Sequence, residues 1–283
     1  MPTLAVGDKV VGYEDYGSGP VLLLIHGSPG NAKAWSRVGE RLSDRYRIIA
    51  PDLPGYGATT PQSSDAVPDA AHAVELIEAL VASIGPPIVL AGHSYGGVVA
   101  LALALRQRFP IGALVLFEPV ALRILSVAGE VDVFESAKAV FDDYLSCFEG
   151  GDHQAIRKII DFWYRPGAFD QMPDPVKAYL LKETAANTRD VRATFREEYS
   201  PSSLRNLTVP ILTVCGSRSP AVTQKIAKAI AAHTPRGSFV GLENADHALT
   251  TTHVEAVAEA ISNAAANAAQ PPLARGAPQA ARP

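Results

Sequence analysis

The sequence predicts an α/β protein with a mostly parallel sheet that is covered by helices on both faces. Apolar runs of strand length alternate along the chain with amphipathic runs of helix length, as in folds built from strand–helix–strand units. The run from Val21 to Ile25 is apolar at every position, which is typical of a strand buried on both faces. In such a sheet the parallel strands end at one common edge, where ligands bind.

The strands and helices can be assigned in chain order. Segments 4–6 and 9–16 are short and polar enough to form an antiparallel starting hairpin. Further strands are expected at 21–25, 47–50, 88–91, 113–117, 210–215 and 238–242. Helices are expected at 32–44, 69–84, 98–105, 222–232 and 254–264. In the second of these helices apolar residues recur on one face, at Val74, Ile77, Leu80, Val81 and Ile84.

The alternation stops between residues 121 and 206, where only helical patterns occur, separated by prolines. We expect 121–206 to form a helical cap over the sheet edge, because a structureless loop of this length is rare in a compact domain. The core would then comprise 1–120 and 207–269. Residues 270–283 are rich in Pro, Ala, Gly and Arg, and a disordered tail is expected there.

Composition argues against several classes of function. The net charge is −4 and basic residues do not cluster, which argues against nucleic acid as a partner. Cys147 and Cys215 lie far apart, so neither a disulfide framework nor a zinc site is expected. Without a phosphate loop, a metal cluster or a dinucleotide fingerprint, we expect no cofactor and no metal. No segment reads as a signal peptide or a membrane span, so a cytoplasmic protein without membrane contact is expected, its oligomeric state open.

The most informative motif is Gly-His-Ser-Tyr-Gly-Gly at 92–97, between an apolar run and a helix-forming run. A serine between two glycines at a strand-to-helix turn is typical of a nucleophile elbow. Glycines are needed because the chain reverses sharply and leaves no room for side chains. The turn would lift the hydroxyl of Ser94 above the sheet, beside the amides of the following helix. The alternative is an ordinary tight turn.

A serine hydroxyl needs a base that removes its proton. His247 follows the last expected strand and precedes the final helix, so it should lie at the same sheet edge as Ser94. The alternative for His247 is a surface loop position. His253 lies within the following helix and His93 within the motif itself, so both are less suitable as the base.

A second motif, His-Gly-Ser-Pro-Gly at 26–30, follows the strand 21–25. Its glycines would let the loop pass close to the nucleophile, so that the amides of Ser28 and Tyr95 could form an oxyanion hole. The alternative is a plain loop of turn formers. A third stretch, Pro-Asp-Leu-Pro-Gly-Tyr-Gly at 51–57, reads as loop architecture, and we assign it no chemistry.

With these motifs in this order and spacing, the chain resembles the α/β-hydrolase superfamily over residues 5–265. The resemblance implies an α/β-hydrolase fold with a mostly parallel eight-stranded sheet, and a helical cap inserted after the sixth strand. It also implies a triad in the chain order nucleophile, acid, histidine.

The chain departs from this superfamily at the acid. The usual aspartate follows the seventh strand, where this sequence has Ser219, which cannot stabilise an imidazolium. Glu118 directly follows the sixth strand, a position that resembles the acid of some haloalkane dehalogenases. We therefore expect Glu118 to be the acid, with Asp246 as the weaker alternative and a structural or solvent-facing role of Glu118 as another.

A serine nucleophile with a base and an oxyanion hole suits acyl transfer. The leading hypothesis is a carboxylic-ester hydrolase for small to medium acyl chains. The alternatives are a lactonase, a hydrolase of carbon–carbon bonds in diketones, a perhydrolase or haloperoxidase, and a non-catalytic small-ligand binder. Aromatic residues of the insertion are candidates for an acyl pocket: Trp163, Phe141 and Tyr144, with Phe162 and Phe169 as further candidates.

Overall fold

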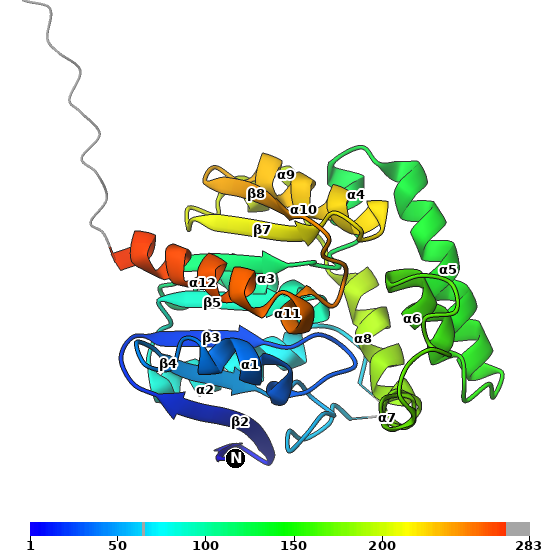
Figure 1. Ribbon diagram of the computed structural model, residues 1–283, viewed down its shortest axis with the longest axis horizontal. Coiled ribbons are helices and arrows are strands. Elements are labelled where there is room, and N and C mark those ends of the chain that lie inside the picture. Colours follow the sequence, from blue (N-terminus) through cyan, green and yellow to red (C-terminus); the bar gives the residue numbers. More distant parts are fainter. Residues whose placement is uncertain (64–65, 270–283) are drawn as a thin grey trace, which may run out of the picture.

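The computed structural model describes residues 1–63 and 66–269, which contain an eight-stranded sheet in the order β1-β2-β4-β3-β5-β6-β7-β8 (Figure 1). β1 pairs with β2 and β2 with β4 in antiparallel fashion, and all other neighbours are parallel. The fold class expected from the sequence is therefore confirmed. The strands are β1 (Thr3–Val6), β2 (Lys9–Gly17), β3 (Val21–Ile25), β4 (Arg47–Pro51), β5 (Val89–His93), β6 (Ala113–Phe117), β7 (Ile211–Gly216) and β8 (Gly237–Leu242).

Helices cover both faces of the sheet because successive strand side chains point to opposite sides. In β3, Leu23 and Ile25 belong to one apolar core, whereas Leu22 and Leu24 belong to the other. The first core is covered by α2 (Ala71–Ile84), α3 (Tyr95–Arg106) and α10 (Ala221–His233). The second is covered by a 3-10 turn (Ala32–Trp35), α1 (Ser36–Glu40), α11 (Leu249–Thr252) and α12 (Val254–Ala269).

Six helices lie between β6 and β7, with no strand among the described residues of this segment. These helices are α4 (Ile124–Val127), α5 (Val131–Glu149), α6 (Ile156–Trp163), α7 (Asp174–Lys182), α8 (Thr184–Arg196) and α9 (Pro201–Arg205). Of these, α5, α6, α7 and α8 lie beyond the carboxyl ends of the parallel strands, whereas α9 lies beside α10 (Figure 1). We call all six helices the helical insertion. The domain boundaries at 120/121 and 206/207 stay a prediction, and the expected tail at 270–283 lies outside the described residues.

One expected helix differs from the structure. Segment 32–44 is not a continuous helix but a 3-10 turn, the short α1, and further turns. After α1 the amides of Arg41 and Leu42 bond to the carbonyls of Val38 and Gly39, three residues back. This tighter pattern ends an α-helix. Among the described helices none combines the length and apolarity that a membrane crossing requires.

Candidate active site

Ser94 lies at the turn between β5 and α3 in a strained backbone conformation. Its φ is 54° and its ψ −121°, a region that non-glycine residues adopt only when the surrounding structure enforces it. The neighbouring glycines cannot be replaced without movement of the backbone. A Cβ at Gly96 would lie 2.4 Å from the carbonyl oxygens of Ile25 and His26, and one at Gly92 would lie 2.2 Å from that of Gly96. Close packing of β3, β5 and α3 therefore holds Ser94 in place.

His247 lies in the loop between β8 and α11, with its ring between two polar partners. Its Nε2 is 3.1 Å from the Oγ of Ser94, and its Nδ1 is 3.3 Å from the Oε2 of Glu118. With Glu118 ionised, Nδ1 donates to the carboxylate and Nε2 is left to accept a proton from Ser94. The ring of Trp163 stacks on that of His247, with centroids 5.0 Å apart and planes 14° apart. The described geometry thus leaves Nε2 aimed at Ser94.

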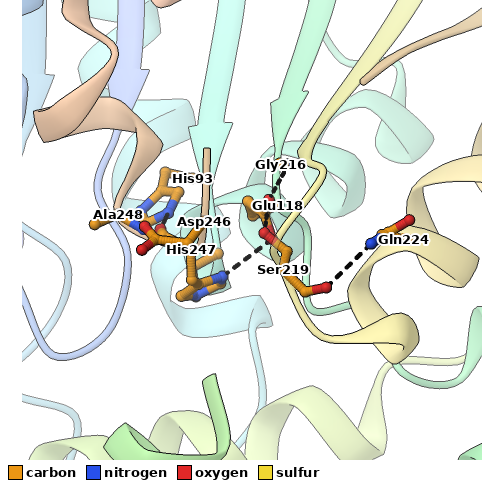
Figure 2. Close-up of polar contacts among 9 residues, drawn as sticks. His93, Glu118, Gly216, Ser219, Gln224, Asp246, His247 and Ala248 are labelled. Atoms are coloured by element: carbon orange, nitrogen blue, oxygen red, sulfur yellow. Dashed lines mark hydrogen bonds and ion pairs between the residues drawn. The ribbon is translucent and has the colours of Figure 1, made fainter. Parts of the chain in front are cut away.

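His93 contacts the backbone of His247 rather than Ser94. Its Nε2 donates to the carbonyl oxygen of His247 over 2.9 Å (Figure 2). Burial is the main cause that lowers the pKa of His93 to about 3, so this ring is neutral at neutral pH. His93 therefore anchors the loop that carries His247.

Glu118 is the first residue after β6 and is fully buried. Its Oε1 accepts hydrogen bonds of 2.6 Å each from the Gly216 amide and the Ser219 hydroxyl, while Oε2 faces His247 (Figure 2). Burial alone would raise the pKa of Glu118, but hydrogen bonds from His247, Gly216 and Ser219 together lower it. A carboxylate that accepts several hydrogen bonds stays charged in this way.

The other candidate acid, Asp246, points elsewhere. Its Oδ1 accepts a hydrogen bond of 3.0 Å from the amide of Ala248, a local turn contact of the kind that aspartate often makes. The structure thus brings Glu118, and not Asp246, to the ring of His247.

The two amides expected to form an oxyanion hole belong to Tyr95, which follows Ser94, and to Ser28, in a loop close to Ser94. Tyr95 is the first residue of α3, so its amide has no intrahelical acceptor and lies at the positive end of the helix dipole. The loop with Ser28 passes close to the nucleophile, because a Cβ at Gly27 would lie 2.9 Å from the Cβ of Ser94. His26 supports this loop: its Nδ1 donates to the Gly27 carbonyl and its Nε2 accepts from the Leu53 amide.

Two pockets meet at Ser94. The first is bounded by Ser28, Ser94 and Tyr95 and mainly by apolar side chains of the insertion and of the loop after β6. These apolar residues are Val120, Leu122, Phe141, Ile159, Trp163, Val191 and Phe195. The second pocket, on the side of His247, shares Ser28, Ser94, Ile159 and Trp163 with the first. A substrate bound across Ser94 could therefore extend in two directions.

The aromatic candidates of the insertion have different positions. Phe141 and Trp163 line the first pocket, with ring centroids 5.6 Å apart. The structure departs from expectation at Tyr144, which lies behind the pocket wall because its hydroxyl donates to the Oδ1 of Asn187 over 2.8 Å. Phe162 packs edge-on against Phe141 and Trp163, and Phe169 is buried in the insertion. These two are core residues of the insertion.

Sequence analysis missed three polar residues around the first pocket. Asn187 and Asp190 line it, and Tyr56 bonds to Asp190. The spacing of Asn187 and Asp190 on α8 places them on one helix face, but a polar helix face usually faces solvent. Tyr56 belongs to the stretch 51–57 to which we assigned no chemistry. In 1–63 and 66–269, no His, Cys, Asp or Glu side chains form a group that could hold a metal ion.

Comparison with known proteins places this site in a family. Residues 22–260 match the sequence profile described as "Alpha/beta hydrolase family". The chain belongs to the alpha/beta hydrolase family. The resemblance inferred from the motifs is thereby confirmed.

Individual relatives of this α/β hydrolase are distant. (E)-2-((N-methylformamido)methylene)succinate hydrolase of Acinetobacter baylyi is 24% identical over 90% of this chain and 93% of the relative. Lipase 1 of Psychrobacter immobilis is 27% identical over 92% of this chain and 81% of the relative. The structure of a thermophilic esterase from Thermogutta terrifontis, solved with malate bound, superposes with a TM-score of 0.70 at 24% identity, covering 95% of this chain and 97% of the other. This structural likeness shows the fold.

Within this hydrolase fold, Ser219 contacts Glu118. It stands where the sequence comparison with the superfamily places an aspartate, and its hydroxyl donates to Glu118. Its own backbone carbonyl accepts a hydrogen bond of 3.1 Å from the Nε2 of Gln224 (Figure 2). The position therefore contacts the carboxylate next to His247 without carrying an acid itself.

Proposed function

We propose that this α/β hydrolase is a serine hydrolase that cleaves carboxylic esters of small to medium acyl chains through an acyl-enzyme. Ser94 is the nucleophile, His247 the base and Glu118 the acid. The observation that carries the proposal is the hydrogen-bonded row from Ser94 through His247 to Glu118, with distances of 3.1 and 3.3 Å. These are the contacts that nucleophile, base and acid require in acyl transfer.

The reaction follows from these positions. His247 takes the proton of Ser94 as its Oγ attacks the ester carbonyl carbon, and the resulting oxyanion receives hydrogen bonds from the amides of Ser28 and Tyr95. The tetrahedral intermediate collapses, and His247 protonates the departing alcohol. A water molecule, deprotonated by His247, then attacks the acyl-enzyme and releases the carboxylic acid and the free Ser94. Glu118 stabilises the imidazolium form of His247 in both the acylation step and the deacylation step.

The pockets support acyl groups of limited size. The first pocket has apolar walls, which suit an acyl chain. The second pocket contains the ring of His247 and the Thr250 side chain among its lining residues, so it suits the alcohol that His247 protonates.

A second candidate function is hydrolysis of a lactone or of a carbon–carbon bond in a diketone. It needs the same serine attack on a carbonyl carbon. The relative of Acinetobacter baylyi, whose name describes a substituted methylene succinate as its substrate, supports a wider substrate range than simple esters. A panel of p-nitrophenyl esters, lactones and diketones distinguishes the two candidates by their kcat/KM.

The proposal is tested with Ser94→Ala and His247→Ala. Each should lower the kcat for p-nitrophenyl butyrate roughly 10⁴–10⁶-fold, because the three residues act as a unit. His253→Ala is the matched control. Within the described part of the chain, the His253 ring bonds only to the exposed Thr252, so the rates of this variant should stay close to those of the wild type. A fluorophosphonate should add mass at Ser94 alone. Turnover of either test variant within tenfold of wild type would contradict the assignment, and absence of any turnover in the wild type would favour a non-catalytic binder.

A further inference from the structure

A chain of hydrogen bonds runs along one wall of the first pocket. The Tyr144 hydroxyl donates to the Oδ1 of Asn187 over 2.8 Å, and the Nδ2 of Asn187 donates to the Oγ of Ser28 over 2.9 Å. Ser28 Oγ lies 2.9 Å from the Tyr56 hydroxyl, which donates to the Oδ2 of Asp190 over 2.7 Å. The chain joins five side chains from four separate segments of the sequence.

The donors in this chain run in one direction. When Asp190 is ionised, Tyr56 donates its only hydroxyl hydrogen to this carboxylate, so the bond between Ser28 and Tyr56 is donated by Ser28. The Ser28 oxygen in turn accepts from Asn187. In this state each hydroxyl and amide along the chain has a defined role, and the chain ends on the Asp190 carboxylate as acceptor. Chains of this kind are stiffer than isolated hydrogen bonds, since each bond polarises the next.

Asp190 is a partly buried carboxylate on the wall of the first pocket. Desolvation is the main cause that raises its pKa to about 7, opposed by the nearby hydroxyls of Ser28 and Tyr56 and by the charge of Arg189. Its Oδ2 accepts the hydrogen bond of the Tyr56 hydroxyl, which offsets part of the cost of burying the carboxylate.

The chain connects the helical insertion to the loop of the proposed oxyanion hole. Tyr144 belongs to α5, and Asn187 and Asp190 belong to α8. Ser28 follows β3 and Tyr56 follows β4, so both lie in core loops. A second contact joins the same parts: the hydroxyl of Tyr179, on α7, donates to the carbonyl oxygen of Gly30 over 3.0 Å. Residues 26–30 form no helix or strand, so side-chain contacts must hold this loop.

We propose that Tyr56, Asn187 and Asp190 are positioning residues that hold Ser28 so that its amide faces the carbonyl oxygen of the substrate. This inference rests on the proposed function, because it assigns the Ser28 amide to the oxyanion hole. Catalysis by such a donor depends on its placement within a few tenths of an ångström. In this arrangement α8 of the insertion determines the geometry of the oxyanion hole as well as the shape of the acyl pocket.

The cleanest test is Tyr56→Phe, which removes both hydroxyl contacts and keeps the ring that packs edge-on against His26 at 5.6 Å. The kcat for p-nitrophenyl butyrate should fall by about tenfold or more, with little change in KM, because the oxyanion forms only in the transition state. The inhibition constant of an alkyl trifluoromethyl ketone, which forms an oxyanion adduct with the serine, should rise by the same factor. Asp190→Leu should behave likewise.

Tyr199→Phe is the matched control. The Tyr199 hydroxyl is buried without a hydrogen-bond partner among the described residues, so its removal breaks no contact to Ser28. Its kcat, KM and inhibition constant should stay within about twofold of wild type. If Tyr56→Phe also stayed within twofold in kcat and inhibition constant, the positioning role would be overturned. A rise in KM with unchanged kcat would overturn it too, and would assign these residues to substrate binding.

Hydrogen–deuterium exchange measures the mobility of the Ser28 loop and does not depend on substrate turnover. A peptide that covers residues 26–31 should exchange faster in Tyr56→Phe than in the wild type and in Tyr199→Phe, because the loop loses the link to α8 that runs through Tyr56 and keeps only the bond to Asn187. If the wild type hydrolysed no ester, the proposed function would fail. Faster exchange would then still support the link between α8 and the Ser28 loop, whereas unchanged exchange would overturn it.

Discussion

Two residues at the ends of neighbouring strands share an unusual backbone conformation. Ser94 follows β5 with a φ of 54°, and Glu118 follows β6 with a φ of 49°. The strands pair in register up to His93 and Phe117, and the Ser94 amide bonds to the Phe117 carbonyl over 3.0 Å. Both strands therefore turn sharply at the same level, which directs a hydroxyl and a carboxylate toward His247. The backbone strain of two residues is the physical basis of this candidate site.

Glu118→Gln tests the acid directly. The variant keeps the shape of the side chain but removes its charge, so kcat should fall by roughly several hundredfold to 10⁴-fold. Circular dichroism should show an unchanged fold. In the Glu118→Gln background, Ser219→Asp should recover part of the rate, because the Ser219 hydroxyl lies 2.6 Å from the Oε1 of Glu118. A Glu118→Gln rate within tenfold of wild type would remove Glu118 from the triad.

Ser219→Ala tests the support of that carboxylate. Loss of a hydrogen bond to an ionised group costs about 1.5–3 kcal/mol, and it should raise the pKa of Glu118 from its lowered value. The stability contributed by the charged carboxylate, which is lost as the pH falls through this pKa, should then be lost at a higher pH than in the wild type. Urea unfolding between pH 3 and pH 6 measures the shift. Ser219→Thr keeps a hydroxyl and should resemble the wild type.

At the scale of elements, α6 brings the helical insertion into contact with the proposed base. Its apolar face is buried in the insertion, and Trp163 at its last position stacks on His247. Trp163 also lines both pockets that meet at Ser94. One side chain of the insertion thus borders both pockets and covers the ring of the proposed base.

Trp163→Ala should therefore change specificity as well as stability. Removal of the indole enlarges both pockets, so the ratio of kcat/KM for p-nitrophenyl octanoate over butyrate should rise. Phe169→Ala is the matched control, because Phe169 is also a large buried aromatic of the insertion and its truncation should cost about 3–5 kcal/mol of stability. Both variants should melt at lower temperature, but only Trp163→Ala should change the ratio. If both variants had the same ratio of kcat/KM for octanoate over butyrate, the role of Trp163 would be purely structural.

At the scale of the whole molecule, buried titratable groups respond to pH with opposite signs. Burial lowers the pKa of His26 to about 4 and that of His93 to about 3. Both rings gain protons on unfolding in mild acid, so their contribution to stability falls as the pH drops below 6.5. The pKa of Asp190 is raised from 3.8 to about 7. Its contribution to stability is therefore lost as the pH rises through 7, and it grows on acidification.

Asp190→Asn should consequently make the protein more sensitive to acid. From pH 7 to pH 5 the wild type loses stability through its histidines, and protonation of Asp190 in the folded state offsets part of that loss. The variant lacks this offset, so its free energy of unfolding should fall more steeply than that of the wild type between pH 7 and pH 5. Urea unfolding at the two pH values measures the difference. Asp170→Asn, which alters an exposed carboxylate, should match the wild-type slope, and an equal slope in Asp190→Asn would contradict the prediction.

Much of this protein could be predicted from local sequence. Apolar runs and helical periodicity indicate which faces are buried, so the mostly parallel sheet and most element positions could be predicted from the chain and its motifs, whereas the strand order came from the structure. The glycines around Ser94 indicate a tight turn of the backbone that only glycine permits. The position of His247 followed from a rule of topology, namely that parallel strands end at one edge, and Glu118 was chosen because its position resembles that of the acid in some haloalkane dehalogenases. The structure brings these three residues together, and their catalytic roles stay predictions.

Only the tertiary structure decided which side chains meet across the insertion. Tyr56 and Asp190 are 134 positions apart, and Ser28 and Asn187 are 159 apart. A polar residue on a helix looks the same in sequence whether it faces water or a buried serine. The same holds for Tyr144, whose aromatic ring suggested a pocket wall and whose hydroxyl instead bonds to Asn187 behind it. Helical periodicity gives the buried face of α5 and α8, but the rotation and docking of whole helices on the core determine which residue of that face reaches the substrate.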